Sequence, residues 1–510
     1  MLERRVQVMT ADEAVAQIPD GATVFVGGSG GGIQEPTELL AALGRRHRES
    51  GAPTDLTVWH CSGIGDRDAQ GLSLIAEPGM LHRVVGGHWG MAPRMAELAL
   101  SEQIEAYNLP QGAISQLLRE IAGARPGLIT KIGLGTFVDP ELEGGRINRR
   151  SPEGVVRRIT IDGEEHLFYP SFPIDVAFIR GSAIDERGNL TLDDEAALLE
   201  ALAIAQATHA SGGTVIVQAQ RLAAAGSLHP RQVRVPGVVT DIACIAPEQH
   251  QTAVRRYDPA LSGDLRSPTT SIPRLPASAR KVVARRATRE VRAGEIVNIG
   301  VGMPDGVASV ALEEDRLHEL TFAVEQGNVG GIPITGVEFG AVVNPEATIE
   351  QAAQFDFFNA GGLDVAVLGM AQLDAKGNVN VSRYGDSLSG CGGFIDISQG
   401  AKRVVFCGTL TSGGLRAELT GDSLRIEQEG RHRKLVRDVD QVTFSSRRAL
   451  ERGQPVLYVT ERAVFELTDQ GLELVEIAPG VDLEKEVIGL VDFEPIVNEP
   501  KLMDPALFAP

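Results

Sequence analysis

The 510-residue sequence is poor in cysteine and in positive charge, and it has no long apolar run. Its four cysteines stand far apart without CxxC spacing, which predicts free thiols in a reducing cytoplasm and no zinc site. The net charge of −20 argues against a nucleic-acid or anionic-membrane partner, although local basic residues and backbone N–H groups can still hold a small anion. No stretch approaches the ~18 apolar residues of a membrane span. The charged start, 1–5, has no signal-peptide core after it. The sequence therefore predicts a cytoplasmic protein.

Nucleotide-binding and metal-binding patterns are also missing. Neither glycine loop, at 27–32 or at 300–306, continues as the dinucleotide fingerprint G-x-G-x-x-G, and the phosphate-binding pattern G-x-x-x-x-G-K-[ST] does not occur. The ten histidines include no pair at metal-ligand spacing. We therefore expect no bound metal and no cofactor.

What the sequence does contain is an ordinary globular mixture, 43% apolar and 23% charged, over a length that predicts two or three domains. Strand, glycine loop and helix open the chain, as in an α/β protein. We predict an N-terminal α/β domain at 1–255, a Pro/Ser-rich linker at 256–278 and a second α/β domain at 279–510. The last seventy residues alternate apolar and polar positions, which predicts a small β-rich segment.

The second half of the chain repeats features of the first. Segment 175–190 (DVAFIRGSAIDERGNL) and segment 364–379 (DVAVLGMAQLDAKGNV) carry two aspartates and a Gly-Asn pair at identical spacing. Earlier in each half, 18–27 (IPDGATVFVG) resembles 291–300 (VRAGEIVNIG). Two matches in the same order predict two related α/β halves, the first enlarged by an insertion.

One carboxylate stands where an α/β protein binds its ligand. The apolar run 320–324 predicts a strand that ends at Glu325, and a glycine-rich turn follows at once. Ligands of open α/β sheets bind at the carboxyl ends of the strands, so Glu325 is a candidate nucleophile. The alternative is an acid at a strand end that only meets solvent.

Two further glycine clusters are candidate sites. Residues 27–31 fit G-x-S-x-G, the nucleophile elbow of serine hydrolases, with Ser29 in the nucleophile's place. That elbow normally follows several strands, whereas here only a helix precedes the first strand. Residues 389–394 (SGCGGF) are either a tight turn or a row of backbone N–H donors for an oxyanion, and Cys391 lies within them.

An ordered set of motifs resembles the family I CoA-transferases of the fused, single-chain acetate/propionate and 3-oxoacid type. The motifs span nearly the whole chain: 27–32 (GGSGGG), 86–90 (GGHWG), 106–112 (AYNLPQG), 324–331 (VEQGNVGG), 340–345 (GAVVNP), 377–382 (GNVNVS), 390–397 (GCGGFIDI) and 458–463 (YVTERA). The resemblance implies two similar open, Rossmann-like α/β domains with the active site at their cleft. It also implies a homo-oligomer, a dimer or a tetramer, and a place in short-chain fatty acid or ketone body metabolism.

The resemblance implies a covalent role for Glu325. The carboxylate attacks an acyl-CoA to give an acyl-glutamyl anhydride, and the released thiolate then forms a glutamyl-CoA thioester by a ping-pong mechanism. Coenzyme A is a substrate here and no cofactor is implied; the other partners are acyl-CoA and small carboxylic acids. The family pattern has Glu-Ser-Gly at this place, whereas this chain has Glu325-Gln326-Gly327.

Further site residues follow from the same resemblance. Gln111 is a candidate for binding the substrate carboxylate, with a surface turn as its alternative. Gly392 and Gly393 are candidate oxyanion donors, and Gly28 and Gly30 lie in a loop expected to close over the substrate. Two other functions stay open: a serine acyl-CoA thioesterase using Ser29, and a non-catalytic acyl-CoA sensor.

Overall fold

The computed structural model describes residues 5–268 and 274–509. The chain forms two compact units: unit 1 contains residues 1–267, 324–356 and 388–396, and unit 2 contains residues 268–323, 357–387 and 397–510. The predicted domain boundaries stay a prediction. Residues 269–273 of the predicted linker, and residues 1–4 of the charged start, lie outside the described residues.

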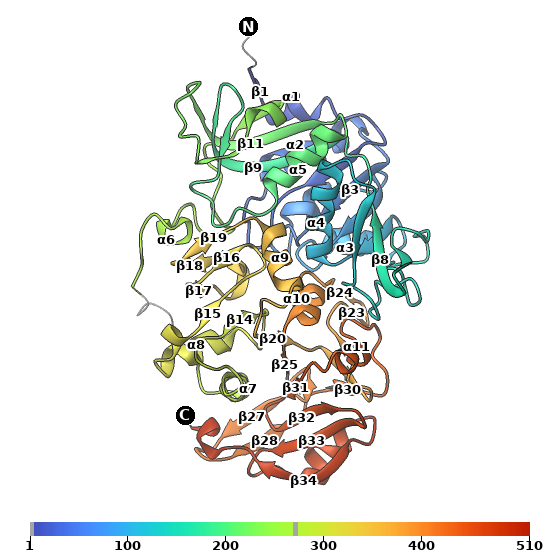
Figure 1. Ribbon diagram of the computed structural model, residues 1–510, viewed down its shortest axis with the longest axis vertical. Helices are drawn as coiled ribbons and strands as arrows, with labels where there is room; N and C mark the ends of the chain where they lie inside the picture. Colours follow the sequence, from blue (N-terminus) through green and yellow to red (C-terminus); the bar gives the residue numbers. More distant parts are fainter. Residues whose placement is uncertain (1–4, 269–273, 510) are drawn as a thin grey trace. The chain divides into compact units, whose positions relative to one another are not determined.

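Unit 1 is built on a largely parallel sheet in the order β1-β13-β11-β9-β2-β3-β4-β5, and β10 pairs antiparallel with both β9 and β12 (Figure 1). Its strands are β1 (Gln7–Met9), β2 (Thr23–Val26), β3 (Leu56–His60), β4 (Leu81–Gly86), β5 (Glu105–Asn108), β9 (Val176–Asp185), β10 (Leu190–Thr191), β11 (Thr214–Ala223), β12 (Val233–Val235) and β13 (Ile242–Ile245). Its helices are α1 (Ala11–Val15), α2 (Thr37–Ser50), α3 (Pro93–Leu100), α4 (Gln111–Ala122), α5 (Ala201–Ala210) and α6 (Pro259–Ser262). Parallel strands of this kind confirm the predicted α/β class.

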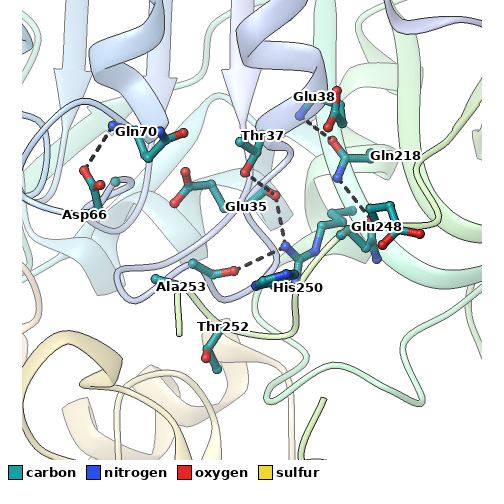
Figure 2. A pocket seen from close by; sticks show the side chains of 14 residues that line it. Glu35, Thr37, Glu38, Asp66, Gln70, Gln218, Glu248, His250, Thr252 and Ala253 are labelled. Carbon is teal, nitrogen blue, oxygen red and sulfur yellow. Dashed lines mark hydrogen bonds between the residues drawn. The ribbon is translucent and has the colours of Figure 1, made fainter. Parts of the chain in front are cut away.

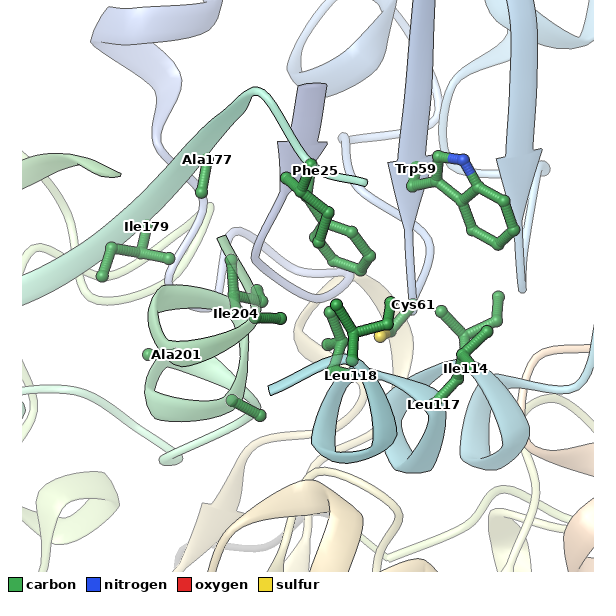
Figure 3. Packing of buried hydrophobic residues seen from close by; sticks show 14 of the residues in the cluster. Phe25, Trp59, Cys61, Ile114, Leu117, Leu118, Ala177, Ile179, Ala201 and Ile204 are labelled. Atoms are coloured by element: carbon green, nitrogen blue, oxygen red, sulfur yellow. The ribbon is translucent and has the colours of Figure 1, made fainter. Parts of the chain in front are cut away.

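Successive residues of strand β2 face opposite layers of helices. Phe25 belongs to the core under α4 and α5, together with Leu118 and Ile204 (Figure 3). Val24 and Val26 belong to the core on the other side, with residues of α1, α2 and α3. Both cores are apolar because a parallel sheet covered on two faces leaves its strands no contact with water. The sequence Thr-Ala-Asp-Glu at 10–13 predicts a capping box, and Thr10 and Glu13 form it at the start of α1.

Unit 1 also contains smaller sheets. Strands β6 (Gly127–Thr130), β7 (Arg157–Ile161) and β8 (Glu164–Pro170) form one of them. After residue 324, β16 (Asn328–Val329) pairs with β19 (Ala347–Thr348), and β17 (Ile332–Pro333) pairs with β18 (Val342–Val343). Helix α9 (Gln351–Asn359) begins directly after these short ladders.

Unit 2 has its own eight-stranded sheet in the order β15-β14-β20-β25-β31-β32-β33-β34. These strands are β14 (Ile296–Ile299), β15 (Thr321–Phe322), β20 (Val365–Gly369), β25 (Val404–Cys407), β31 (Val456–Val459), β32 (Ala463–Thr468), β33 (Gly471–Ile477) and β34 (Ile496–Leu502). Its helices are α7 (Ala279–Thr288), α8 (Gly306–Glu313), α11 (Ser446–Glu451) and α12 (Leu483–Glu486), and α10 (Phe394–Gly400) begins in unit 1. The predicted β-rich C-terminal segment is present, and it continues the main sheet of unit 2.

Short strands complete unit 2. They are β21 (Gln372–Asp374), β22 (Val379–Asn380), β23 (Arg383–Tyr384), β26 (Thr411–Ser412), β27 (Arg416–Leu419), β28 (Leu424–Gln428), β29 (His432–Arg433) and β30 (Leu435–Val436), together with β24 (Ser387–Leu388), which ends in unit 1. None of these was predicted, because runs of two to five residues give little periodic signal.

The internal repeat corresponds to one structural motif that occurs once in each unit. In unit 1, Asp185 Oδ1 accepts the Asn189 N–H at 2.9 Å and Asp185 Oδ2 accepts Asn189 Nδ2 at 3.0 Å. In unit 2, Asp374 and Asn378 make the same two hydrogen bonds at 2.9 and 3.0 Å. The strand order β3-β2-β9-β11-β13 also matches β15-β14-β20-β25-β31. The two units therefore share a core topology.

Two elements differ from what the sequence predicts. The largely apolar stretch 195–208 predicts a helix from Glu195, whereas α5 begins at Ala201, because residues before it adopt loop conformations, including Leu199 at φ +48°. The strand predicted at 320–324 is paired only over Thr321–Phe322. No helix within 5–268 and 274–509 combines the length and apolar character that crossing a membrane requires.

Candidate active site

Glu325 lies in a tight turn that is closed by backbone hydrogen bonds. The Val324 N–H donates to the Asn328 carbonyl at 3.0 Å, and the Gly327 N–H donates to the Val324 carbonyl at 3.1 Å. Gly327 has φ +104°, and a Cβ added there would lie 2.0 Å from the Ile349 carbonyl oxygen. Only 9% of Glu325 is exposed. The backbone therefore fixes where the carboxylate leaves the main chain.

Two side-chain amides link this turn to other segments of unit 1. Asn328 Nδ2 donates to the Ala196 carbonyl at 2.9 Å. Gln354 Nε2, on helix α9, donates to the Val324 carbonyl at 3.2 Å, directly before Glu325. Asn328 and Gln354 are fully buried, so each bond is shielded from competing water.

A third side-chain amide of this region, that of Gln351 on α9, is connected through Gln111 to the glycine cluster at 389–394. Gln111, the first residue of α4, donates from Nε2 to Gln351 Oε1 at 3.1 Å, and its backbone N–H donates to the Gly392 carbonyl at 3.0 Å. Gly392 in turn donates its N–H to the Gly87 carbonyl at 2.7 Å. Gln351 is fully buried, and its Nε2 has no hydrogen-bond partner among the described residues. One connected network thus joins Gln111, Gln351 and Gly392.

The glycine cluster is anchored through its neighbours as well. The Cys391 N–H donates to Asn108 Oδ1 at 2.9 Å, and the Cys391 thiol donates to the Leu109 carbonyl at 3.4 Å. Burial raises the pKa of Cys391 well above its ordinary value, so this thiol is not a ready nucleophile. Gly112 donates its N–H to Asp396 Oδ2 at 3.1 Å. The first turn of α4 and the cluster are therefore tightly joined.

The first glycine loop borders a cavity of about 280 Å³ (Figure 2). Lining residues include Gly32, Glu35, Thr37, Asp66, Arg180, Gln218 and His250. Burial raises the pKa of Glu35 to about 7, and nearby Arg180 partly opposes this rise. Arg180 itself is buried and binds Glu195 through two nitrogens, at 3.0 and 2.7 Å. A protonatable carboxyl and a buried ion pair thus lie beside the loop.

A second buried carboxyl lies near the start of this loop. Burial raises the pKa of Glu200 to about 8, and interactions with the Cys61 thiol and the Gly28 N–H oppose the rise. Only 1% of Glu200 is exposed. At neutral pH this side chain is largely protonated, so the loop rests against a neutral carboxyl rather than a carboxylate.

Comparison with known proteins covers the whole chain. A protein-family model described as coenzyme A transferase matches residues 8–243. The chain is 45% identical to acetate CoA-transferase YdiF of Escherichia coli K12, over 99% of this chain and 95% of that protein. The chain belongs to the coenzyme A transferase family. It is also 44% identical to the caffeate CoA-transferase of Acetobacterium woodii, over 98% of this chain and 97% of that protein.

Solved structures agree with this assignment. The apoenzyme of acyl-CoA transferase YdiF from Escherichia coli O157:H7 superposes with a TM-score of 0.95, at 44% identity, over 99% of this chain and 96% of that one. A thioester complex of that protein with CoA gives the same TM-score, identity and coverage. The predicted family, fold class and CoA-transferase activity are confirmed.

All the site residues predicted for this CoA-transferase lie in unit 1: Glu325, Gln111, Gly392, Gly393, Gly28 and Gly30. Their assigned roles stay predictions. Gln111 is buried at the start of α4, which excludes its alternative as a surface turn residue. Gly392 directs its N–H at the Gly87 carbonyl in this conformation, as described above.

Ser29 does not form the nucleophile elbow that its motif suggested. In that motif the serine directly precedes a helix, whereas here α2 begins only at Thr37 and Ser29 instead pairs with Ile33 in a short β-bridge. Its Oγ accepts a hydrogen bond from Gln326 Nε2 at 3.2 Å. The serine thioesterase alternative is therefore not favoured.

Three buried amides of this CoA-transferase escaped the sequence analysis: Asn328, Gln351 and Gln354. The last two lie three residues apart, on one face of α9, and the apolar residues beside them (Ala352, Ala353, Phe355 and Phe358) are the sequence signal for a buried helix. Among the described residues, no group of three or more His, Cys, Asp or Glu side chains is arranged to hold a metal ion.

Proposed function

We propose that this CoA-transferase moves CoA between a short-chain acyl-CoA and a free carboxylate through a thioester on Glu325. The observation that supports this role is the hydrogen-bonded turn around Glu325, which fixes where a mostly buried side chain leaves the backbone. Fixing a nucleophile in advance removes part of the entropic cost of reaction.

The proposed reaction has two halves. A Glu325 carboxylate oxygen attacks the acyl-CoA carbonyl, the C–S bond breaks, and an acyl-glutamyl anhydride and CoA thiolate result. The thiolate then attacks the glutamyl carbonyl, which releases the original acid as a carboxylate and leaves CoA bound to Glu325. A second carboxylate reverses these steps. Both leaving groups depart as stable anions, so we propose that no metal, cofactor or general acid is needed.

Tetrahedral intermediates on this path carry an oxyanion that needs N–H donors. Losing one such donor typically costs ~2.7–4 kcal/mol of transition-state stabilisation. We propose Gly393 as the principal donor, since Gly392 already donates to Gly87. Gln111 is proposed to bind the substrate carboxylate with the amide that it now directs at Gln351.

Substrate identity is proposed from the relatives. The acetate enzyme and the caffeate enzyme are almost equally similar to this chain, at 45% and 44% identity. Relatives named succinyl-CoA:3-ketoacid coenzyme A transferase are 24% to 26% identical. We propose acetate as the acceptor and a short-chain acyl-CoA as the donor, in a cytoplasmic homo-oligomer.

Mass analysis after incubation with acyl-CoA alone tests the covalent step. We expect a CoA adduct on the peptide that contains Glu325, reducible by borohydride, and none in Glu325→Gln. An active Glu325→Gln variant would contradict the proposal.

Initial rates with C2 to C6 carboxylates, 3-oxobutanoate and caffeate test the substrate assignment; a preference for caffeate would overturn it. Unchanged activity after dialysis against EDTA is expected.

A further inference from the structure

Gln326 and Ser29 form a side-chain link between the nucleophile turn and the first glycine loop. Gln326 Nε2 donates to Ser29 Oγ at 3.2 Å. Gln326 is 3% exposed and Ser29 is 1% exposed. Neither residue contacts bulk water to any extent, so the bond has little competition from solvent.

The Gln326 carboxamide is also confined by the backbone around it. Gly340 has φ +105°, and a Cβ added there would lie 2.7 Å from the Gln326 amide carbon. A Cβ added at Gly31, in the glycine loop, would lie 2.7 Å from the Val337 carbonyl oxygen. Segment 337–340 thus packs against both the loop and the carboxamide, which restricts the Gln326 side chain.

Gln326 directly follows Glu325 in the turn. Glu325 and Gln326 are the two central residues of the turn that Val324 and Gly327 close. A fixed Gln326 side chain restricts rotation of the peptide group between the two residues. That peptide group sets the direction in which the Glu325 side chain leaves the backbone.

We propose that Gln326 is a positioning residue for the nucleophile and that Ser29 is the acceptor that holds it. The bond transmits the position of the glycine loop to the Glu325 turn. Ser29 thereby has a role that involves neither nucleophilic attack nor contact with the acyl group. The inference rests on the proposed covalent role of Glu325, and it names the residues that orient the Glu325 side chain.

Single-turnover formation of the CoA adduct tests this inference in Ser29→Ala, Gln326→Leu and the double variant. We expect each single change to lower the maximal rate about 10-fold, since a buried hydrogen bond is lost and the nucleophile is misaligned. The double variant should lose about as much as either single variant, since all three remove the same bond. The half-saturating acyl-CoA concentration should stay within about twofold, because neither side chain is proposed to bind substrate.

Gln454→Leu is the matched control. Gln454 is a buried glutamine of unit 2 whose Nε2 donates to two carbonyls, at 2.8 and 2.6 Å. The Gln454→Leu variant should have a lower melting temperature and an unchanged single-turnover rate. This result would separate an effect on the orientation of Glu325 from an effect on the stability of the protein. Ser29→Ala removes a single oxygen atom, so it still tests the inference if Gln326→Leu does not fold.

Distinct results overturn the two proposals. A wild-type rate in Ser29→Ala, or a loss of about 100-fold in the double variant as the product of independent effects, overturns the positioning role alone. Absence of any adduct in the wild-type protein overturns the covalent role of Glu325, whatever the variants do.

Discussion

Replacing Gly327 by alanine is the sharpest test of the turn that carries Glu325. Gly327 has φ +104°, a conformation that costs an L-residue about 1–2 kcal/mol. The added Cβ would also lie 2.0 Å from the Ile349 carbonyl oxygen, and ordinary contact begins at 3.4 Å. The turn or its neighbour must therefore move by more than an ångström. A displacement of about 1 Å at a reacting group costs about 100-fold in rate.

Gly421 provides the control for this substitution. It has φ +101° in an exposed turn of unit 2, and a Cβ added there meets no atom within 4 Å. Gly421→Ala therefore carries the same backbone strain without the collision. We expect both variants to lose about 1–2 kcal/mol in urea unfolding from strain alone, with a further loss in Gly327→Ala from the collision.

Rate measurements then distinguish the two effects. Gly327→Ala should lower kcat about 100-fold and slow adduct formation on Glu325 by a similar factor, whereas Gly421→Ala should keep the wild-type kcat. If Gly327→Ala retained wild-type kcat, or lost no more than Gly421→Ala, the turn would not fix the carboxylate and the reasoning would be wrong.

Three further changes test the buried polar groups. Burial raises the pKa of Glu35 from 4.5 to about 7, so its contribution to stability is full below pH 4.5 and is lost as the pH rises from there through 7, by up to about 3 kcal/mol. Glu35→Gln should flatten this decline when the free energy of urea unfolding is compared at pH 5 and pH 8, and an unchanged decline would contradict the argument. Arg180→Leu should cost about 3–5 kcal/mol by leaving Glu195 buried and unpaired, and adding Glu195→Leu should recover part of it; a double variant as unstable as the single would refute the pairing argument. Gly112→Ala would place a Cβ 2.3 Å from Asp396 Oδ1, so it should cost about 1–3 kcal/mol in thermal unfolding, and a wild-type melting temperature would show that the contact relaxes freely.

The sequence predicted those parts of the fold whose signal is local. Segments 56–60 and 296–299 are largely apolar and follow turn residues, which predicts a strand in each, and β3 and β14 match these segments at both ends. The predicted start of α5 was wrong because of interactions with residues elsewhere in the chain. Glu195 reads as a helix former, but its carboxylate binds Arg180 on strand β9, and Leu199 leaves the helical conformation.

The candidate site divides in the same way. Glu325 and the glycine clusters were visible because motifs of this family are contiguous. Gln351 was not, because its importance comes from Gln111, which lies 240 positions away in the sequence. Ser29 matches the G-x-S-x-G motif, but helix α2 begins only at Thr37, so the loop does not have the geometry of a nucleophile elbow. Side-chain pairs between distant segments carry no periodicity that a single sequence can reveal.

The order in which the ribosome makes this chain has a consequence for unit 1. Cys391 and Ile395 belong to the same apolar core as Phe25 in strand β2. Residues 1–267 therefore leave the ribosome with that core incomplete, and its last members follow only with 388–396. At typical elongation rates this delay lasts about 10 s. During that time the apolar face of α4 lacks part of its cover, so newly made chains should depend on chaperones more than their stability when complete would suggest.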